Sequence, residues 1–283
     1  MDTVEPMTRQ PGAPAVEELE LELLLEALFQ CYGYDFRGHE RSALRHKLRA
    51  VMTQLGARTI SSLQDRVLHD HGAVAALLRA LHVPPAAMFD DAQEVSQLRV
   101  VLGSCLHGAA LPKVWLADCA GAQQAWTLAI LLREEQLDSR TEIFATVPTD
   151  EQLAEAQDDS LPLSQLPALQ ENYARCGGQG KLLDHFQVQG ERAVLLPQLR
   201  SRITWAQYNL VTDASFNEFQ LIVCRRALPD FGPVLRRRVL RLFHDSLAPF
   251  GVLGLDRTFD EDDALAASYQ PLLPQLAWYK RTA

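Results

Sequence analysis

Three polar side chains flank one short turn near the middle of the chain. Asp118, Gln123 and Gln124 lie on either side of an Ala-Gly-Ala turn, which follows the apolar run 114–117 and precedes small and apolar residues at helical spacing. A strand, a tight turn and a helix N-terminus are the parts from which α/β proteins build cofactor crevices. The stretch therefore predicts a nucleotide-type site. It is poor in the glycines and acidic side chains that such a ligand needs, so a plain scaffold role stays open.

Two arginines follow a second apolar run. Arg225 and Arg226 come directly after residues 219–224, which predict a buried strand. Ligands of open α/β sheets bind outside the carboxyl ends of the strands, so the pair could attract an anionic nucleotide. Arginines in this place also serve as surface salt-bridge partners, and both interpretations stay open.

Three further arginines share one predicted helix. Arg41, Arg45 and Arg49 are four residues apart, which places them on one solvent-facing line of a helix, with Lys47 nearby. Such a line could bind an acidic protein partner. The alternative is an ordinary solvated face of an amphipathic helix.

Composition excludes several classes of protein. The chain has 283 residues, 47% of them hydrophobic, and a formal net charge of -9, which argues against a general nucleic-acid binder. Its five cysteines are far apart and lack metal-ligand spacing. The N-terminus has no secretory signal pattern, and no apolar run approaches the roughly 20 residues that span a bilayer. We therefore expect a cytoplasmic protein that does not insert into membranes.

Helix and turn signals divide the chain into a leader and two domains. Residues 1–15 are expected to be a disordered leader, and residues 16–83 a helical domain of four helices. Two consecutive prolines end that domain, because proline cannot continue a helix. Residues 84–98 should form the linker and the first helix of the second domain, which spans residues 99–283.

Strand and helix patterns alternate in the second domain, which predicts an α/β fold with a mostly parallel sheet and helices on both faces. Residues 157–190 are the least regular region. The last strand, expected at 275–280, should lie at the edge of the sheet. Further strands are expected at 114–117, 142–146, 186–189, 193–196, 203–208, 219–224 and 251–255.

An ordered series of motifs runs from about residue 32 to residue 281. The motifs are Gly33-Tyr-Asp-Phe36, Leu44-Arg-His-Lys-Leu-Arg-Ala-Val-Met52 with Gly56, Met88-Phe89 with Asp91, Val114-Trp-Leu-Ala117 with Cys119, Phe144-Ala-Thr146, Asn209-Leu210, Cys224-Arg225 with Phe231, and Tyr279. In this order they resemble the CheR-type chemotaxis receptor methyltransferases, which use S-adenosylmethionine to esterify receptor glutamates. The resemblance implies a helical domain followed by a Rossmann-like methyltransferase domain with a small β insert within residues 157–205.

The chain departs from that family where the resemblance places the cofactor. The positions implied to form this site are Ala86, Asp90, Asp118, Ala122, Gln123, Val147, Asn209 and Arg226. The family has threonine and arginine in place of Ala86 and Asp90, and the aspartate that binds the ribose in place of Val147. It also has glycine in place of Asp118 and asparagine in place of Arg226. Each lost hydrogen bond of this kind costs on the order of 1–3 kcal/mol, so three losses would weaken binding by roughly a thousandfold.

These departures predict a pseudoenzyme with no catalytic residues, no metal and no cofactor, acting as a protein-binding regulator in bacterial signalling. The expected partner is an acidic, helical signalling protein bound by Arg41, Arg45, Lys47 and Arg49. The alternative is an active protein-glutamate O-methyltransferase with a rebuilt pocket and S-adenosylmethionine as its cofactor. Neither hypothesis involves nucleic acid or membrane insertion.

Overall fold

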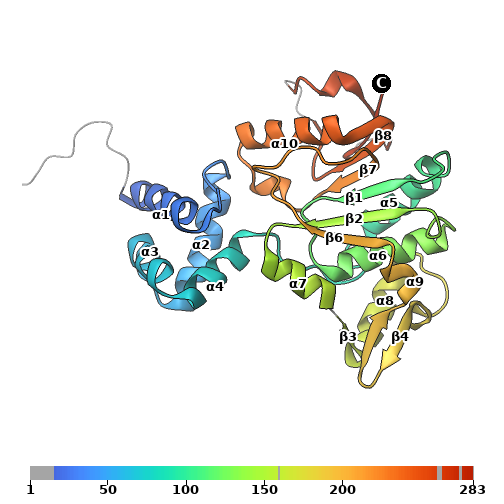
Figure 1. Ribbon diagram of the computed structural model, residues 1–283, viewed down its shortest axis with the longest axis horizontal. Helices are drawn as coiled ribbons and strands as arrows, with labels where there is room; N and C mark the ends of the chain where they lie inside the picture. Colours follow the sequence, from blue (N-terminus) through green and yellow to red (C-terminus); the bar gives the residue numbers. More distant parts are fainter. Residues whose placement is uncertain (1–15, 159, 260–262, 274–275, 283) are drawn as a thin grey trace, which may run out of the picture. The chain divides into compact units, whose positions relative to one another are not determined.

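The computed structural model describes residues 16–158, 160–259, 263–273 and 276–282. The described residues up to Leu81 form one compact unit, and those from His82 onward form another. Figure 1 labels the helices and strands of both units. The leader expected at residues 1–15 lies outside the described residues.

The first unit is helical, as predicted. Its helices are α1 (Val16–Tyr32), α2 (Arg41–Leu55), α3 (Ile60–His69) and α4 (His71–Leu81). Each helix buries one apolar stripe in a shared core, so that leucines recur on α1 at positions 21, 24, 25 and 28. Gly56 ends α2 with a left-handed φ of 66°, and Thr59 caps α3 by accepting a hydrogen bond from the Ser62 amide.

A seven-stranded sheet forms the centre of the second unit, in the order β6-β2-β1-β7-β8-β10-β9. Its strands are β1 (Lys113–Leu116), β2 (Glu142–Val147), β6 (Ile203–Gln207), β7 (Phe219–Cys224), β8 (Leu247–Leu255), β9 (Tyr269–Pro271) and β10 (Trp278–Arg281). The strands from β6 to β8 in this order pair in parallel, whereas β10 pairs antiparallel with both β8 and β9. The chain order reverses between β1 and β7, which is where open α/β sheets bind ligands.

Helices cover both faces of this sheet (Figure 1). The helices α5 (Ala92–Cys105), α6 (Ala122–Glu134) and α7 (Asp150–Asp158) pack on one face, and α10 (Pro233–Ser246) packs on the other. The pleat of β1 divides its residues between the two cores. Val114 lies in the core beneath α6, whereas Trp115 lies in the core beneath α10.

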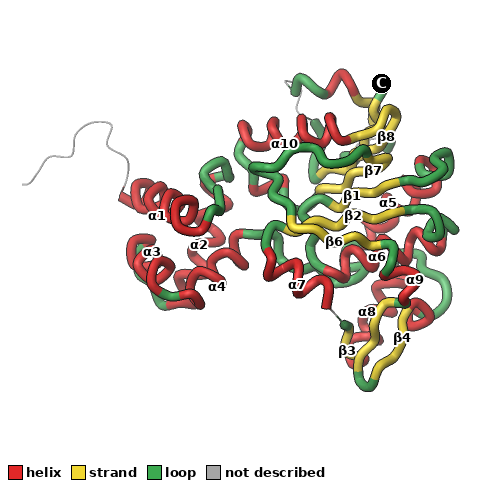
Figure 2. Tube along the Cα trace, viewed as in Figure 1, coloured by secondary structure: helices red, strands yellow, loops and turns green. Residues whose placement is uncertain are grey.

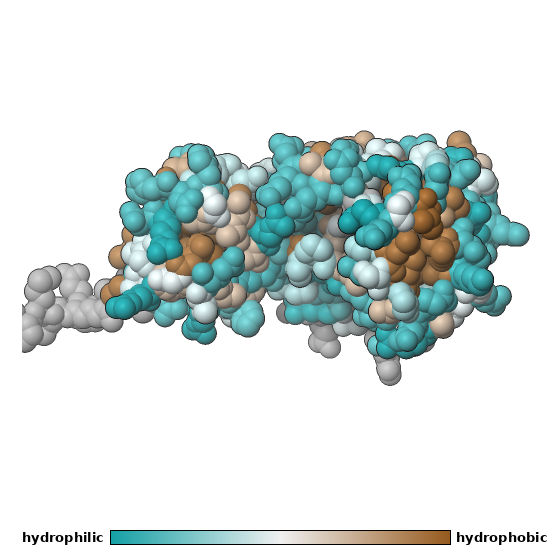
Figure 3. Space-filling model, turned by 90° about the horizontal axis from the view of Figure 1, so that it is seen from below, coloured by the Kyte–Doolittle hydropathy of each residue, from teal (hydrophilic) through white to brown (hydrophobic). Residues whose placement is uncertain are grey.

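A β insert, residues 161–195, extends from the α6 face (Figure 2). Its three antiparallel strands have the order β3-β5-β4. Its elements are β3 (Leu161–Pro162), η1 (Leu163–Gln165), α8 (Leu166–Arg175), η2 (Leu182–His185), β4 (Phe186–Gln189) and β5 (Arg192–Leu195). The short helices α9 (Pro197–Arg200), η3 (Leu228–Asp230) and η4 (Ala266–Ser268) complete the unit. Leu183 and Val188 of the insert are exposed. Figure 3 shows a broad apolar area on one face of the molecule.

Two predictions about this unit are wrong. The strand expected at 275–280 is β10, which begins at Trp278 and lies between β8 and β9 rather than at an edge. The short β9 covers it, and a three-residue strand ending in proline leaves no periodic signal. The region expected to be the least regular contains the ten-residue helix α8. Pro167 does not prevent this helix, because it stands in the first turn, where proline is tolerated.

The boundaries of the other expected strands agree within a few residues. Thr149 caps α7, since its hydroxyl accepts a hydrogen bond from the Gln152 amide at 3.2 Å. The helix expected to end near residue 98 continues to Cys105. All five cysteines are free thiols. None of the helices in the described part of the chain is long and apolar enough to cross a membrane.

Candidate functional site

The carboxyl ends of β1 and β7 lie side by side in the sheet. A pocket of about 490 Å³ opens beside them, which is within the range of roughly 300–1,000 Å³ typical of small-molecule sites. Four carboxylates and two guanidinium groups line it. The lining residues are Asp90, Asp91, Ala92, Glu94, Arg225, Arg226 and Asp256.

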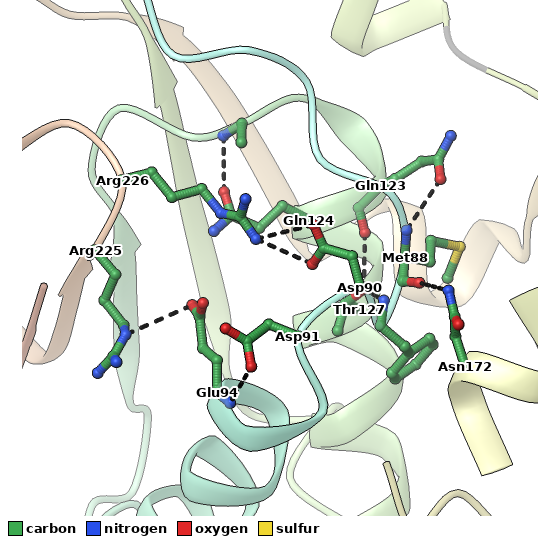
Figure 4. A network of polar contacts seen from close by, with 12 residues as sticks. Met88, Asp90, Asp91, Glu94, Gln123, Gln124, Thr127, Asn172, Arg225 and Arg226 are labelled. Carbon is green, nitrogen blue, oxygen red and sulfur yellow. Dashed lines mark hydrogen bonds and ion pairs between the residues drawn. The ribbon is translucent and has the colours of Figure 1, made fainter. Parts of the chain in front are cut away.

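Arginines neutralise three of these carboxylates. The ion pairs are Asp90 with Arg226, Glu94 with Arg225, and Asp256 with Arg236. Arg226 Nη2 donates to both carboxylate oxygens of Asp90, at 3.0 and 3.1 Å (Figure 4). Arg225 Nε lies 3.9 Å from Glu94 Oε1, which is too far for a hydrogen bond. Burial raises the pKa of Glu94, and the two nearby arginines oppose that rise. Three of the four carboxylates therefore have an arginine partner, whereas Arg225 Nη1 and Arg226 Nε are buried without a hydrogen-bond partner.

Two glutamine side chains at the start of α6 bind backbone amides in the turn after β1 and in the linker. Gln124 Oε1 accepts a hydrogen bond from the Ala120 amide at 2.7 Å, and Gln123 Oε1 accepts one from the Met88 amide at 3.1 Å (Figure 4). Asp118 has a left-handed φ of 53°, where the resemblance places a glycine. Aspartate tolerates this conformation better than most residues, so the turn keeps its shape without the glycine.

Beneath the turn, little space remains. The inner cavity has a volume of about 30 Å³. A single water molecule needs roughly 10–15 Å³, so the cavity has room for only a few waters. Among the residues lining it are Asp90, Gln124, Thr127 and Arg226. A cofactor of nucleoside size therefore does not fit this inner cavity in the conformation described.

The remaining expected cofactor positions contribute no polar side chain to these two pockets. Val147, at the end of β2, is 1% exposed and packs in the apolar core. Asn209 Oδ1 accepts a hydrogen bond from the Val211 amide at 2.8 Å, which closes a local turn. Ala122 is buried, and the Ala86 amide donates to the Ala120 carbonyl at 2.8 Å. The structure thus joins Asp90 to Arg226, while Val147 and Asn209 line neither pocket.

The sequence analysis did not identify two residues that shape the pocket. Glu94 reaches it from the first turn of α5, and Arg236 supports it from α10, where this arginine is only 6% exposed. Arg236 Nη1 donates to Asp256 Oδ1 at 3.0 Å. An arginine on the apolar face of a predicted helix indicates a buried ion pair, but the neighbouring sequence does not identify the acidic partner.

The arginine line on α2 is less open to solvent than expected. Arg41 and Arg45 both form ion pairs with Glu18 of α1, and their side chains are 34% and 33% exposed. Lys47 Nζ donates to the Leu81 carbonyl at 2.8 Å. Arg49 lies 4.0 Å from Glu17 and keeps 72% of its side chain exposed. The three arginines thus each have a glutamate of α1 nearby, and only Arg49 is largely exposed.

Within the described ranges, no group of three or more histidine, cysteine, aspartate or glutamate side chains is arranged to hold a metal ion.

Comparisons with known proteins agree with this architecture. The family model described as "CheR methyltransferase, SAM binding domain" matches residues 88–258, and "CheR methyltransferase, all-alpha domain" matches residues 19–82. The chain is 34% identical over 265 residues to "Putative methyltransferase Cher3" of Pseudomonas putida KT2440, covering 93% of this chain and 97% of that protein. It is 23% identical over 252 residues to "Chemotaxis protein methyltransferase 1" of Pseudomonas aeruginosa PAO1, covering 83% and 88%.

A solved glycopeptide N-methyltransferase, MtfA complexed with sinefungin, is 18% identical and covers 70% of this chain and 60% of its own, with a TM-score of 0.35. A likeness this weak carries no argument. The two family models together span both units, and the relative from Pseudomonas putida spans nearly the whole chain, so the chain belongs to the CheR methyltransferase family.

Proposed function

We propose that this member of the CheR family is a protein-binding regulator that does not transfer methyl groups. The observation that carries the proposal is the ion pair between Asp90 and Arg226, which joins two positions where the family resemblance places cofactor contacts. Both groups are engaged with each other. A ligand that needs either of them must first break this pair.

The neighbouring groups support the same conclusion. The carboxamide oxygens of Gln123 and Gln124 accept backbone hydrogen bonds, so they are engaged as well. Val147 offers no acceptor to ribose hydroxyls at the end of β2. The residues present therefore do not fit S-adenosylmethionine in the way that the resemblance implies. A loosely held donor would rarely react, because methyl transfer depends on proximity and alignment.

The partner in this proposal is an acidic, helical signalling protein. Arg49 provides the most exposed cation of the α2 line, and the ion pairs to Glu18 fix Arg41 and Arg45 beside it. Paired arginines still present part of their guanidinium surface to solvent, and exposed charges of this kind mainly speed association. The partner's contacts would therefore centre on Arg49.

An active methyltransferase is the second candidate. The match to a model described as SAM binding and the open pocket of about 490 Å³ favour it. In that case, ligand binding would have to displace Asp90 from Arg226.

A thermal-shift experiment separates the two candidates. A ligand at one hundred times its dissociation constant stabilises the folded state by about 2.7 kcal/mol, which raises Tm by roughly 5 °C or more for a domain of this size. With 0.1 mM S-adenosylmethionine, the proposal expects a shift below about 2 °C. The protein named chemotaxis protein methyltransferase 1 serves as the positive control. A shift of several degrees in the present chain would favour the enzyme.

A further inference from the structure

The linker segment Met88–Asp90 connects the pocket to the β insert. On the pocket side, Asp90 holds Arg226 at 3.0 Å. On the insert side, Asn172 Nδ2 of α8 donates to the Met88 carbonyl at 3.4 Å, and the Cys176 thiol lies 3.6 Å from the Phe89 carbonyl. Figure 4 shows the Gln123 side chain contacting the Met88 amide and the Asn172 side chain contacting the Met88 carbonyl.

Phe89 is strained at the centre of this segment. Its φ is 54°, a left-handed value that is a clear outlier for a bulky residue. The side chain is 1% exposed and contacts the ring of Tyr173 with their centroids 5.1 Å apart. Thr127 Oγ1 of α6 accepts a hydrogen bond from the Phe89 amide at 3.3 Å. Such strain persists only where the surrounding structure fixes the residue. Here the contacts with Tyr173 of α8 and Thr127 of α6 fix Phe89.

Tyr173 is itself fixed between the insert and the sheet domain. Its hydroxyl meets the carboxylate of Glu134 at the end of α6, and Arg99 Nη1 of α5 lies 2.6 Å from the same carboxylate. Arg99 Nε also donates to the Cys176 carbonyl at 2.9 Å. A Cβ on Gly178 would stand 2.3 Å from the Tyr173 ring, so the glycine loop after α8 closes tightly over it. The insert therefore holds Phe89 through a buried and densely bonded contact.

We propose that the Met88–Asp90 segment is a strap that couples the β insert to the pocket, so that a displacement of α8 changes the pairing of Asp90 with Arg226. The strap has two ends with defined bonds and a strained residue between them. Relaxation of Phe89 moves both ends together, because Asp90 is its direct neighbour in the chain. Coupling of this kind is reciprocal, so breaking the pair at Asp90 loosens α8 by the same factor.

Hydrogen exchange followed by mass spectrometry tests the strap without any ligand, and so independently of whether the pocket binds a cofactor. Asn172→Ala removes one bond from the insert end, and Asp90→Asn removes the ion pair from the pocket end. Asn172→Ala should speed exchange at the pocket, in the peptide covering 222–230. Asp90→Asn should speed exchange at the insert, in peptides covering 170–180. The expected increase is roughly twofold or more in each direction.

Matched controls identify non-specific effects. Asn217→Ala removes an amide that accepts from Lys113 Nζ instead of contacting the linker, and Asp150→Asn removes an exposed carboxylate of α7. Both should leave these peptides unchanged, and the α10 peptide 233–246 should keep its rate in every variant. If Asp90→Asn speeds exchange at 86–91 and leaves 170–180 at the wild-type rate, the strap does not couple the two sites and the inference is overturned.

Discussion

Arg226 Nη2 lies 3.0 Å from one carboxylate oxygen of Asp90 and 3.1 Å from the other, which joins the end of β7 to a linker residue 136 positions earlier in the chain. The arginine side chain is 28% exposed and the aspartate side chain 36%. This contact lies at the edge of the pocket, where the family resemblance places cofactor-binding residues of other types.

A double-mutant cycle on this pair should give a small coupling energy. Asp90→Asn and Arg226→Asn are each expected to lower the unfolding free energy, and the coupling should be about 0.2–1 kcal/mol, because water screens both partners. Urea unfolding of the two single variants and the double variant measures it. Strict additivity would mean that the pair contributes nothing measurable to the stability of the fold.

Gly178→Ala should destabilise the insert. The new Cβ would stand 2.3 Å from the buried Tyr173 ring, so the ring or the loop must shift, at a cost of about 1–3 kcal/mol. Gly108→Ala is the control, because no atom lies within 4 Å of its added Cβ. Chemical denaturation compares the two variants. Equal stability would show that the loop adapts without strain.

Stability should fall in mild acid through His185. Burial lowers the pKa of this histidine below its ordinary value of 6.5, so the unfolded chain takes up the proton more readily than the native state. The unfolding free energy is therefore highest above pH 6.5 and decreases as the pH falls from 6.5 toward the lowered pKa.

His185→Gln removes this contribution and should flatten the dependence of Tm on pH between about 6.5 and 5. His244, whose pKa is also lowered by burial, keeps its own contribution in the variant. A slope identical to that of the wild type would contradict the assignment to His185.

Arg49→Glu should reduce capture of the proposed acidic partner. It reverses the most exposed charge of the α2 line while leaving the ion pairs of Arg41 and Arg45 with Glu18 intact. Pull-down from native cells at several salt concentrations measures the effect, since contacts between exposed charges weaken as ionic strength rises. Arg58→Glu, an equal charge reversal in an exposed loop of the same unit, should have no effect. Equal loss with both variants would remove the special role of α2.

The fold could be predicted from the sequence where periodicity is strong. The strand 219–224 and the helices on either side of the sheet have patterns that bury one continuous face, and the structure places them as predicted. β10 was expected at the edge of the sheet, but it lies between β8 and β9. The edge strand β9 could not be predicted, because it is too short to show an alternating hydrophobic pattern. The helix α8 was missed because two nearby prolines suggested a loop.

The location of the candidate site could be predicted from the sequence, but the contacts between its residues could not. The turn after β1 and the arginines after β7 do meet at one edge of the sheet, as parallel topology requires. The pairing of Asp90 with Arg226 could not be read from single positions, because each residue looked like an isolated departure from the family pattern. Two substitutions of opposite sign become one contact only when the linker is placed against the sheet.

Calorimetric titration with S-adenosylhomocysteine tests the central claim most directly, because binding of this product requires the cradle of the cofactor but no methyl acceptor. Chemotaxis protein methyltransferase 1 of Pseudomonas aeruginosa is titrated in parallel as the reference protein. For the present chain, the account predicts a Kd weaker than about 100 µM, since Asp90, Arg226 and Gln124 are engaged with one another or with the backbone and Val147 offers no acceptor. A Kd of about 100 µM or tighter would contradict the account and identify the chain as a cofactor-binding methyltransferase with a rebuilt pocket.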